Sequence, residues 1–365
     1  MKVAIIPWSI DCNKDRIFAI EDKEFNKDHR LNAYFIMQKE FEKKGDELHT
    51  IDMYDQLEEV DYFLFFEYDE KWIIRLWKKG LANRTVYCNG EPEVVNHNNC
   101  KEGYKKIKKY FPYLMTWNDE LVDNVRIFKR INPYFVEPDF GNTPYEERKL
   151  LTNISGNKSS GHEKELYSER LNVINFFEKN YPCQFEFYGK GWSEKNHPCY
   201  GGCPDKKAEV YHKFRFALAL ENMKNVKGYV TEKLLDCLTT GIVPIYAGAV
   251  NITDYVPAEC FIDYNQFSTL EEMAQFLLHM PEEVYNQYLD KARNFIMTGE
   301  LQKKLSGAVY ADNVYALAES GEYHRAFRVR WKDMAVIILK VFKSELSGKI
   351  KKYLRKLRAE GKKDD

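Results

Sequence analysis

Residues 214–263 of the chain read FRFALALENMKNVKGYVTEKLLDCLTTGIVPIYAGAVNITDYVPAECFID. The stretch opens with an apolar run over 214–220, which predicts a buried strand. A helical pattern over 230–240 follows, Gly241 ends it, and a second apolar run over 242–246 predicts another strand. Strand, helix and strand in this order indicate a βαβ unit, and such units build a parallel sheet with helices on its faces.

The same alternation extends in both directions from this stretch. In the first half the sequence predicts strands over 2–6, 61–66, 84–88 and 113–117, helices over 31–44 and 70–79, and a further helix starting at Asn118 and Asp119. In the second half it predicts strands over 149–154, 184–188 and 261–263, and helices over 163–180, 206–213, 270–278 and 282–295. Two such runs predict an α/β protein with two Rossmann-like, doubly wound domains that face each other across a cleft.

A polar segment rich in proline separates the two runs. It covers 132–148 and has the composition of an inter-domain linker. We expect an N-terminal domain over 1–135, a linker over 136–148, a second domain over 149–300 and C-terminal helices over 301–365. Because ligands of doubly wound sheets bind at the carboxyl ends of the strands, we expect the site to lie between the domains.

Composition and motifs exclude several classes of protein. The chain has 365 residues, of which 44% are hydrophobic and 30% charged, as in a globular protein. It contains neither G-x-G-x-x-G nor G-x-x-x-x-G-K-[ST], so a dinucleotide oxidoreductase or a P-loop enzyme has no support. Its eight cysteines are scattered rather than dense, unlike those of a disulfide scaffold.

The C-terminal region differs in charge from the rest of the chain. Residues 325–365 hold 14 Lys and Arg against 5 Asp and Glu, although the whole chain has a net charge of −1. The acidic body argues against nucleic acid as a partner. Apolar residues at helical spacing among the basic ones predict that 334–363 forms an amphipathic helix suited to an anionic membrane surface. The alternative is a helix that packs on the first domain.

The sequence also bears on cellular placement. The chain opens with a short strand pattern over 2–6 instead of a signal peptide, and no apolar run approaches the roughly 20 residues that span a bilayer. We therefore expect a cytoplasmic protein that lies peripherally on the inner face of the membrane.

Charged and polar side chains gather where the strand over 214–220 is followed by the helix. Glu221 and Asn222 lie at the carboxyl end of this strand, and Glu232 and Lys233 lie in the first helical turn. The free N–H groups and positive dipole of a helix N-terminus suit a diphosphate, and Lys233 adds a full positive charge there. The alternative is an ordinary helix start with solvated charges.

The run over 221–257 resembles the signature of the family 10 glycosyltransferases, the α-1,3/1,4-fucosyltransferases. The family pattern is an apolar strand, Glu-Asn, a short loop, Tyr-Val/Ile-Thr-Glu-Lys, then Gly-x-Val-Pro-Ile/Val-Tyr and Gly, and this run matches it almost throughout. The resemblance covers 149–295, extends more weakly to 116–123, and holds only in outline for the N-terminal third. It implies two domains of the GT-B type and a GDP-sugar donor, GDP-fucose.

The resemblance also implies donor-binding residues in the second domain. Lys233 falls where the family's lysine contacts the pyrophosphate, and Glu232, Asn222 and Tyr229 fall where family residues contact the donor. The family's arginine, early in the first helix of the second domain, corresponds to Arg170, for which a solvated helix charge is the alternative. Two cations suit a leaving diphosphate because its developing charge needs partners.

The general base of this family is a glutamate in the first domain, after the strand that ends near residue 88. The segment here reads CNGEPEVVN over 88–96, and it offers Glu91 and Glu93. Glu91 is favoured because it follows a glycine just beyond the strand, and Glu93 remains the alternative. The base would take the proton from an acceptor hydroxyl as that oxygen attacks the donor sugar. Two solvated loop carboxylates are the other interpretation.

The mechanism that the resemblance implies is a single in-line displacement with inversion. Fucose would pass from GDP-fucose to a hydroxyl of a glycan acceptor that contains GlcNAc, in α-1,3 or α-1,4 linkage. We expect acceptor specificity in the first-domain loops over 11–30 and 96–103. The chain lacks Asp-x-Asp, so we expect no metal and no other cofactor.

Two other functions stay open. The same fold could use another nucleotide sugar, because the loop over 223–228 is where donor choice could change. The protein could also bind a sugar nucleotide or glycan without catalysis. This alternative is favoured by the sequence around Glu91, which departs from the usual residues of the family.

Overall fold

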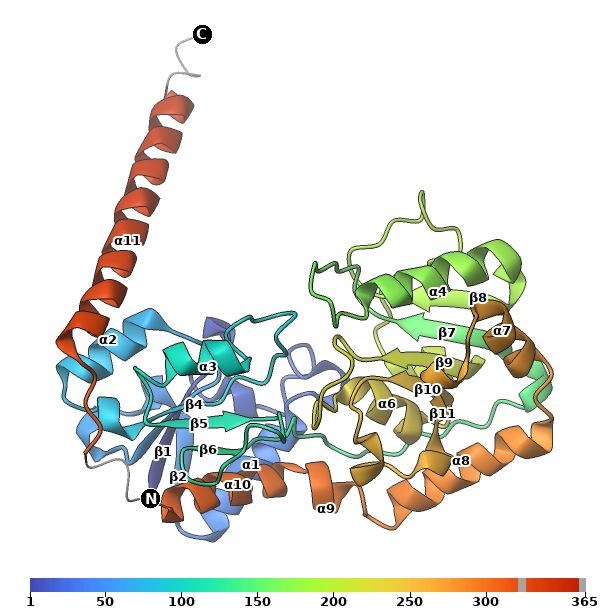
Figure 1. Cartoon of the computed structure of the whole chain (residues 1–365), viewed down its shortest axis with the longest axis horizontal. Coiled ribbons are helices and arrows are strands. Elements are labelled where there is room, and N and C mark those ends of the chain that lie inside the picture. The colour runs from blue at the N-terminus through green and yellow to red at the C-terminus, as the bar shows by residue number, and fades with distance from the viewer. Residues whose placement is uncertain (321–325, 361–365) are drawn as a thin grey trace.

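The computed structural model describes residues 1–320 and 326–360, with side chains up to residue 347. It contains two parallel sheets, and each has helices packed on it (Figure 1). The predicted fold class, α/β with two doubly wound domains, is confirmed.

The first sheet lies within residues 2–129. Its six strands are β1 (Lys2–Ile6), β2 (Glu47–Thr50), β3 (Tyr62–Phe65), β4 (Thr85–Tyr87), β5 (Tyr113–Thr116) and β6 (Ile127–Lys129), in the order β2-β1-β3-β4-β5-β6. All neighbouring pairs are parallel. The crossovers include α1 (Asn32–Lys43), α2 (Glu70–Lys78) and α3 (Lys101–Ile107).

The second sheet lies within residues 149–263 and is also parallel. Its strands are β7 (Lys149–Ile154), β8 (Phe185–Tyr188), β9 (Phe214–Leu220), β10 (Val243–Ala247) and β11 (Ile262–Asp263), in the order β11-β10-β9-β7-β8. The helices of this part are α4 (Tyr167–Asn180), α5 (Lys207–Tyr211), α6 (Glu232–Thr240), α7 (Leu270–Leu278) and α8 (Glu282–Met297). The buried strands β9 and β10 explain the long apolar runs from which the sheet was predicted.

The chain then returns to the first domain through α9 (Gln302–Leu305), α10 (Gly307–Glu319) and α11 (Trp331–Glu360). Helix α10 packs on α1, and the ring of Tyr315 stacks on that of Phe41 with centroids 4.8 Å apart. On its way back the chain touches its own outward crossing, because the Tyr134 N–H donates to the Leu305 carbonyl at 2.6 Å. Both ends of the chain therefore belong to the first domain.

Helix α11 packs antiparallel to α2 and then projects beyond the first domain (Figure 1). Trp331 stacks on Trp77 near the end of α2, whereas Lys340 pairs with Glu70 at its start. Met334 and Ile337 are buried. The predicted tail segment 334–363 is thus partly packed on the first domain. Its side chains from 348 onward, and residues 361–363 altogether, lie outside the described residues.

Three features of the sequence-based assignment differ from the structure. Strands β2 and β6 and helix α3 were not predicted, because they are short and β2 carries polar residues. The helix start predicted at Asn118 is wrong, since Asn118 accepts from Glu120 N–H in a turn. Helix α4 begins at Tyr167 instead of 163, because the preceding residues bond the backbone near Asn222.

Candidate active site

The carboxyl ends of the two sheets face each other, so the loops after their strands meet (Figure 1). The Asp119 N–H, after β5, donates to the Lys227 carbonyl, after β9, at 3.3 Å. The Glu93 carboxylate of the first domain lies 3.6 Å from Nε2 of His162 of the second domain. The site expected from strand topology thus lies where both domains contribute loops.

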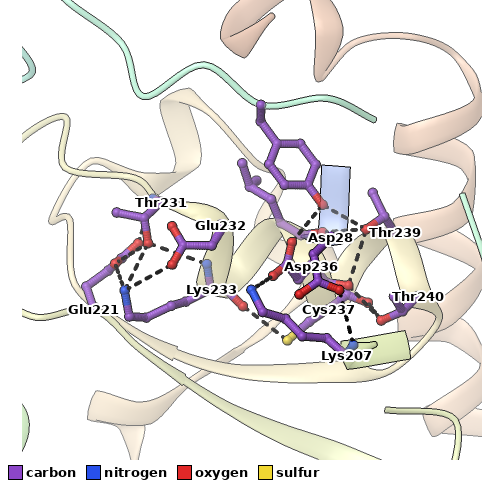
Figure 2. Close-up of polar contacts among 12 residues, drawn as sticks. Asp28, Lys207, Glu221, Thr231, Glu232, Lys233, Asp236, Cys237, Thr239 and Thr240 are labelled. Atoms are coloured by element: carbon purple, nitrogen blue, oxygen red, sulfur yellow. Dashed lines mark hydrogen bonds and ion pairs between the residues drawn. The ribbon is translucent and has the colours of Figure 1, made fainter. Parts of the chain in front are cut away.

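The N-terminus of α6 is organised by a buried carboxylate. Thr231 caps the helix, and its N–H and hydroxyl donate to the two carboxylate oxygens of Glu221 at 2.8 and 2.7 Å (Figure 2). The ammonium of Lys233 lies 3.5 Å from the same carboxylate and 3.3 Å from the Thr231 hydroxyl. Burial raises the pKa of Glu221, whose side chain is fully enclosed. This carboxylate therefore holds both the cap and the cation in place.

Arg170 on α4 reaches the same residue from the other side. Its Nη2 donates to the carbonyls of Leu220 at 2.8 Å and Glu221 at 3.2 Å. The guanidinium is buried and lies over the ring of Tyr167. One residue, Glu221, thus positions both candidate donor-binding cations, one through its carboxylate and one through its backbone.

The polar residues after β9 are tied to the first domain by an aromatic contact. Asn222 Nδ2 donates to the Tyr229 hydroxyl at 3.4 Å. The Tyr229 ring packs on Trp117, which follows β5, with centroids 5.0 Å apart. Trp117, Met223, Val226 and Tyr229 form a small buried cluster that joins the two domains.

Gly228 lies tightly against backbone and side-chain atoms of the first domain. It has φ +85°, and a Cβ built there would lie 2.2 Å from the Trp117 carbonyl oxygen and 2.7 Å from Asp119 Oδ2. Asp119 in turn accepts hydrogen bonds from Asn251 Nδ2 at 3.0 Å and the Tyr255 hydroxyl at 3.1 Å, and pairs with Lys129. The loop over 223–228 is therefore fixed against the first domain.

On the first-domain side, the loop that carries Glu91 is held by its backbone. The Glu91 N–H donates to Asn89 Oδ1 at 2.8 Å, and its carbonyl accepts from Asn99 Nδ2 at 2.6 Å and Trp117 Nε1 at 3.3 Å. Asn99 also donates to Asn89 at 2.8 Å, inside the domain. These contacts leave the Glu91 side chain exposed while its backbone stays fixed.

Electrostatics link Glu91 with the second domain. Desolvation by the nearby protein raises the pKa of the Glu91 carboxyl. The charges of Lys158 and Lys233 oppose this effect. Glu232 adds a like charge that also raises the pKa. In contrast, the Lys233 ammonium lowers the pKa of Glu232. The cation at the start of α6 therefore acts on the carboxylate after β4 across the two domains.

A second polar cluster lies further along α6 (Figure 2). Lys207 Nζ pairs with Asp236 at 2.6 Å, and Asp236 accepts from the Tyr134 hydroxyl at 2.9 Å. The Lys207 N–H donates to Asp28 of the first domain at 3.4 Å. The cluster ties the outward crossing and a first-domain loop to the helix that carries Glu232 and Lys233.

Potential metal ligands do not gather in the part of the chain that the structure describes: no group of three or more His, Cys, Asp or Glu there could hold a metal ion. His197 pairs with Glu178 at 2.7 Å, and Cys199 and Cys203 are free thiols. Within residues 1–320 and 326–360, each helix is too short or too polar to cross a bilayer.

Comparison with known proteins relates the second domain to a family. Residues 149–326 match the model described as "Glycosyltransferase family 10 (fucosyltransferase) C-term". These residues form a family 10 glycosyltransferase domain. An alpha-(1,4)-fucosyltransferase of Arabidopsis thaliana is 40% identical over 77 residues, which are 20% of this chain and 19% of that protein. Alpha-(1,3)-fucosyltransferase 7 of Rattus norvegicus is 34% identical over 89 residues, 24% of each chain.

The matched segments thus span about a fifth to a quarter of these relatives. Likeness of fold extends further. A crystal structure of an alpha1,3-fucosyltransferase with GDP superposes with a TM-score of 0.55 at 16% identity, and the match covers 89% of this chain and 92% of that one. The family 10 domain therefore stands in a two-domain GT-B fold that includes the first domain.

The family 10 domain brings all five of its predicted donor-binding residues close to the carboxyl end of β9. Asn222 and Tyr229 share a hydrogen bond, Glu232 and Lys233 form an ion pair at 3.7 Å, and Arg170 binds the end of β9. Of the two predicted bases, Glu91 is exposed and Glu93 lies 3.6 Å from His162.

Sequence reasoning missed four residues that organise the site. Glu221 was noted as a strand-end residue, but its burial was not visible in the pattern. Trp117 could have been singled out, because it follows an apolar strand directly. Asn89 lies two residues after the end of β4, whereas Asn99 lies in a polar loop where nothing in the sequence marks it.

Proposed function

We propose that the chain transfers fucose from GDP-fucose to a hydroxyl of a glycan acceptor, with inversion and without a metal. The observation that carries the proposal is that Trp117 joins the Glu91 loop to the start of the family 10 helix: its Nε1 donates to the Glu91 carbonyl at 3.3 Å, and its ring packs on Tyr229, which lies shortly before Lys233. A base on one side and a cation at a helix N-terminus on the other are what an in-line displacement needs. The similarity to an alpha-(1,4)-fucosyltransferase and an alpha-(1,3)-fucosyltransferase supports fucose as the sugar.

The donor diphosphate would lie at the N-terminus of α6. Lys233 and the free N–H groups of the first turn would bind it, as at other helix N-termini. Arg170 has five N–H donors, so it can bind a phosphate oxygen while Nη2 stays on the two carbonyls. Glu232, Asn222 and Tyr229 would contact the nucleoside and the sugar.

The general base would be Glu91 rather than Glu93. The Glu91 carboxylate is exposed and its backbone is fixed by three hydrogen bonds. Its raised pKa makes it a stronger base than a fully solvated glutamate. Glu93 is engaged by His162. Glu91 would accept the proton of the acceptor hydroxyl as the oxygen bonds to the anomeric carbon and GDP leaves.

The matched variants Glu91→Gln and Glu93→Gln test this assignment. We expect kcat of Glu91→Gln to fall roughly 10²–10⁴-fold, the usual contribution of general-base catalysis, while Glu93→Gln stays within a few-fold. Both should keep the wild-type thermal stabilisation by GDP in metal-free buffer. Equal loss in both variants would refute the choice of base. Stabilisation by UDP or ADP instead of GDP would refute the donor, and binding without any turnover would identify a non-catalytic protein.

We further propose that α11 lies on an anionic membrane surface, which would place the protein peripherally on the cytoplasmic face. Val336, Leu339, Phe342 and Leu346 are exposed apolar side chains that recur at helical spacing. Lys332, Lys340 and Lys343 lie among them, and further basic residues follow in the sequence. Such a helix combines apolar insertion with attraction to anionic lipid.

Vesicle flotation tests the membrane proposal. We expect the full chain to float with vesicles that contain phosphatidylglycerol and to do so less with purely phosphatidylcholine vesicles. The exposed double variant Leu339→Glu/Phe342→Glu should lose flotation, whereas Leu171→Glu, an exposed apolar position on the second domain, should not. Equal flotation of the three proteins would refute the proposal.

A further inference from the structure

A groove of about 520 Å³ opens in the first domain beside α11. Its floor comes from Pro7–Ile10, which follow β1, and from Glu67–Lys71, which follow β3. Its far wall is one turn of α11, which contributes Lys340, Val341, Ser344 and Glu345. Because β1 and β3 are parallel neighbours, the groove lies at the carboxyl edge of the first sheet.

Aromatic side chains form part of the groove surface. The Trp8 ring stacks parallel to Phe66, with centroids 6.0 Å apart and an interplanar angle of 4°, yet it remains 43% exposed. Tyr68 lines the groove nearby, and Ile10 is exposed beside it. A rigid, half-exposed tryptophan offers an apolar face, and sugar rings present C–H groups that pack on such a face.

The polar side chains of the groove leave an excess of negative charge. Lys340 pairs with Glu70 and Lys71 with Glu345, so both groove lysines are neutralised by partners that tie α11 to α2. The carboxylates of Glu67 and Asp69 remain, and their hydrogen bonds come from backbone N–H groups and a neutral amide. These acceptors suit hydroxyl donors and disfavour a phosphate or an acidic sugar.

The groove is connected with the loop of the proposed base. Glu67 Oε2 accepts from Asn89 Nδ2 at 3.1 Å, and Asn89 Oδ1 accepts the Glu91 N–H at 2.8 Å. Strands β1, β3 and β4 are consecutive in the sheet, so the ends of β1 and β4 are roughly 10 Å apart. A bound oligosaccharide could therefore occupy the groove and still extend towards Glu91.

We propose that this groove binds the neutral part of the glycan acceptor, with Trp8 against a sugar ring and the carboxylates of Glu67 and Asp69 accepting hydroxyl hydrogen bonds. The proposal rests on the fucosyl transfer proposed above and adds the acceptor class and its subsite. The groove is separate from the loops over 11–30 and 96–103, where acceptor specificity was expected. It also gives α11 a second role as a wall of the subsite.

The test uses the full chain and fills the groove from its α11 side. Ser344 is exposed and lines the groove, so Ser344→Trp should occupy it without disturbing the core. Lys343→Trp is the matched control, because it places the same side chain just before Ser344 on α11, at an exposed position that does not line the groove. Trp8→Ala removes the sugar platform. Transfer from GDP-fucose is measured with a panel of neutral oligosaccharides, including N-acetyllactosamine, and with sialylated N-acetyllactosamine.

We expect the wild type to favour a neutral acceptor. Ser344→Trp and Trp8→Ala should raise the acceptor KM at least tenfold with the KM for GDP-fucose unchanged, and Lys343→Trp should match the wild type. An unchanged acceptor KM in both groove variants would overturn the proposal. The proposal would also be overturned if the wild type binds GDP and hydrolyses GDP-fucose but transfers fucose only to the sialylated acceptor or to no acceptor of the panel. Failure of the wild type to bind GDP would instead overturn the proposed function, and the groove assignment would fall with it.

Discussion

Replacing Gly228 by alanine should separate the cost of an unusual backbone from the cost of pushing two domains apart. At φ +85° an L-residue pays about 1–2 kcal/mol relative to glycine. The new methyl group would also lie 2.2 Å from the Trp117 carbonyl oxygen, a backbone atom of the other domain that cannot move alone. Overpacking of this kind adds about 1–3 kcal/mol. We therefore expect Gly228→Ala to lower the free energy of unfolding by about 2–5 kcal/mol.

Gly202 supplies the control. It has φ +88°, and a Cβ built there meets no atom within 4 Å. Gly202→Ala should therefore cost only the backbone part, about 1–2 kcal/mol. Both variants are unfolded in urea and followed by tryptophan fluorescence, and GDP affinity is measured in parallel. Gly228→Ala should also weaken GDP binding, because the loop it distorts leads into Tyr229 and the start of α6.

The two glycine variants together test whether the contact between the domains constrains the protein. If Gly228→Ala loses no more stability than Gly202→Ala, the contact between the 223–228 loop and the first domain does not constrain the protein as we argue. If its stability falls as expected but GDP binding is unchanged, the loop supports the fold and not the donor site.

Two further predictions concern buried and desolvated carboxylates. Glu221→Gln keeps the size of the side chain but turns one of two accepting oxygens into an NH2 donor, which then faces a Thr231 donor. We expect this mismatch to cost about 1–3 kcal/mol in urea unfolding and to raise the Kd for GDP through the weakened hold on Lys233, and the idea fails if both stay at wild-type values. Glu91→Gln should raise the thermal midpoint at neutral pH, because the folded state raises the pKa of this carboxyl and so binds its proton more tightly than the unfolded chain. The stability of the wild type should accordingly fall as the pH rises from 4.5, the ordinary pKa of a glutamate, through the raised pKa of Glu91. The stability that Glu91→Gln gains over the wild type should therefore vanish below pH 4.5. If the variant is still more stable than the wild type in acid, the charge of Glu91 is not the cause.

The sequence was sufficient for the architecture because the strands that decide it are buried on both faces. Strands β9 and β10 appear as continuous apolar runs, so their periodicity is plain, and Gly241 marks the end of the helix between them. Strand β2 has only four residues, ELHT, and its alternation is too short to distinguish from a loop. At residue 118 a local cap signal was overridden by long-range contacts, since Asp119 binds residues of the second domain.

The candidate site was predictable on one side only. The donor side follows from a contiguous motif, so its residues stand close together in sequence as well as in space. The first-domain side depends on side chains from separate loops, and the contacts of Asn99 and Trp117 with the Glu91 carbonyl arise only when the sheet assembles. The groove beside α11 could not be predicted, because it joins residues near the N-terminus to a helix more than 300 positions later.

The two crossings between the domains have a consequence for motion and for engineering. The outward and returning segments touch at Tyr134 and Leu305, so the two covalent connections between the domains lie side by side. A rotation of the domains about these connections would have to separate Trp117 from Tyr229 and Asp119 from Lys227. Topologically the second domain is an insertion within the first. Its boundaries lie next to each other in space, so a donor domain of different sugar specificity could be exchanged there without altering either end of the chain.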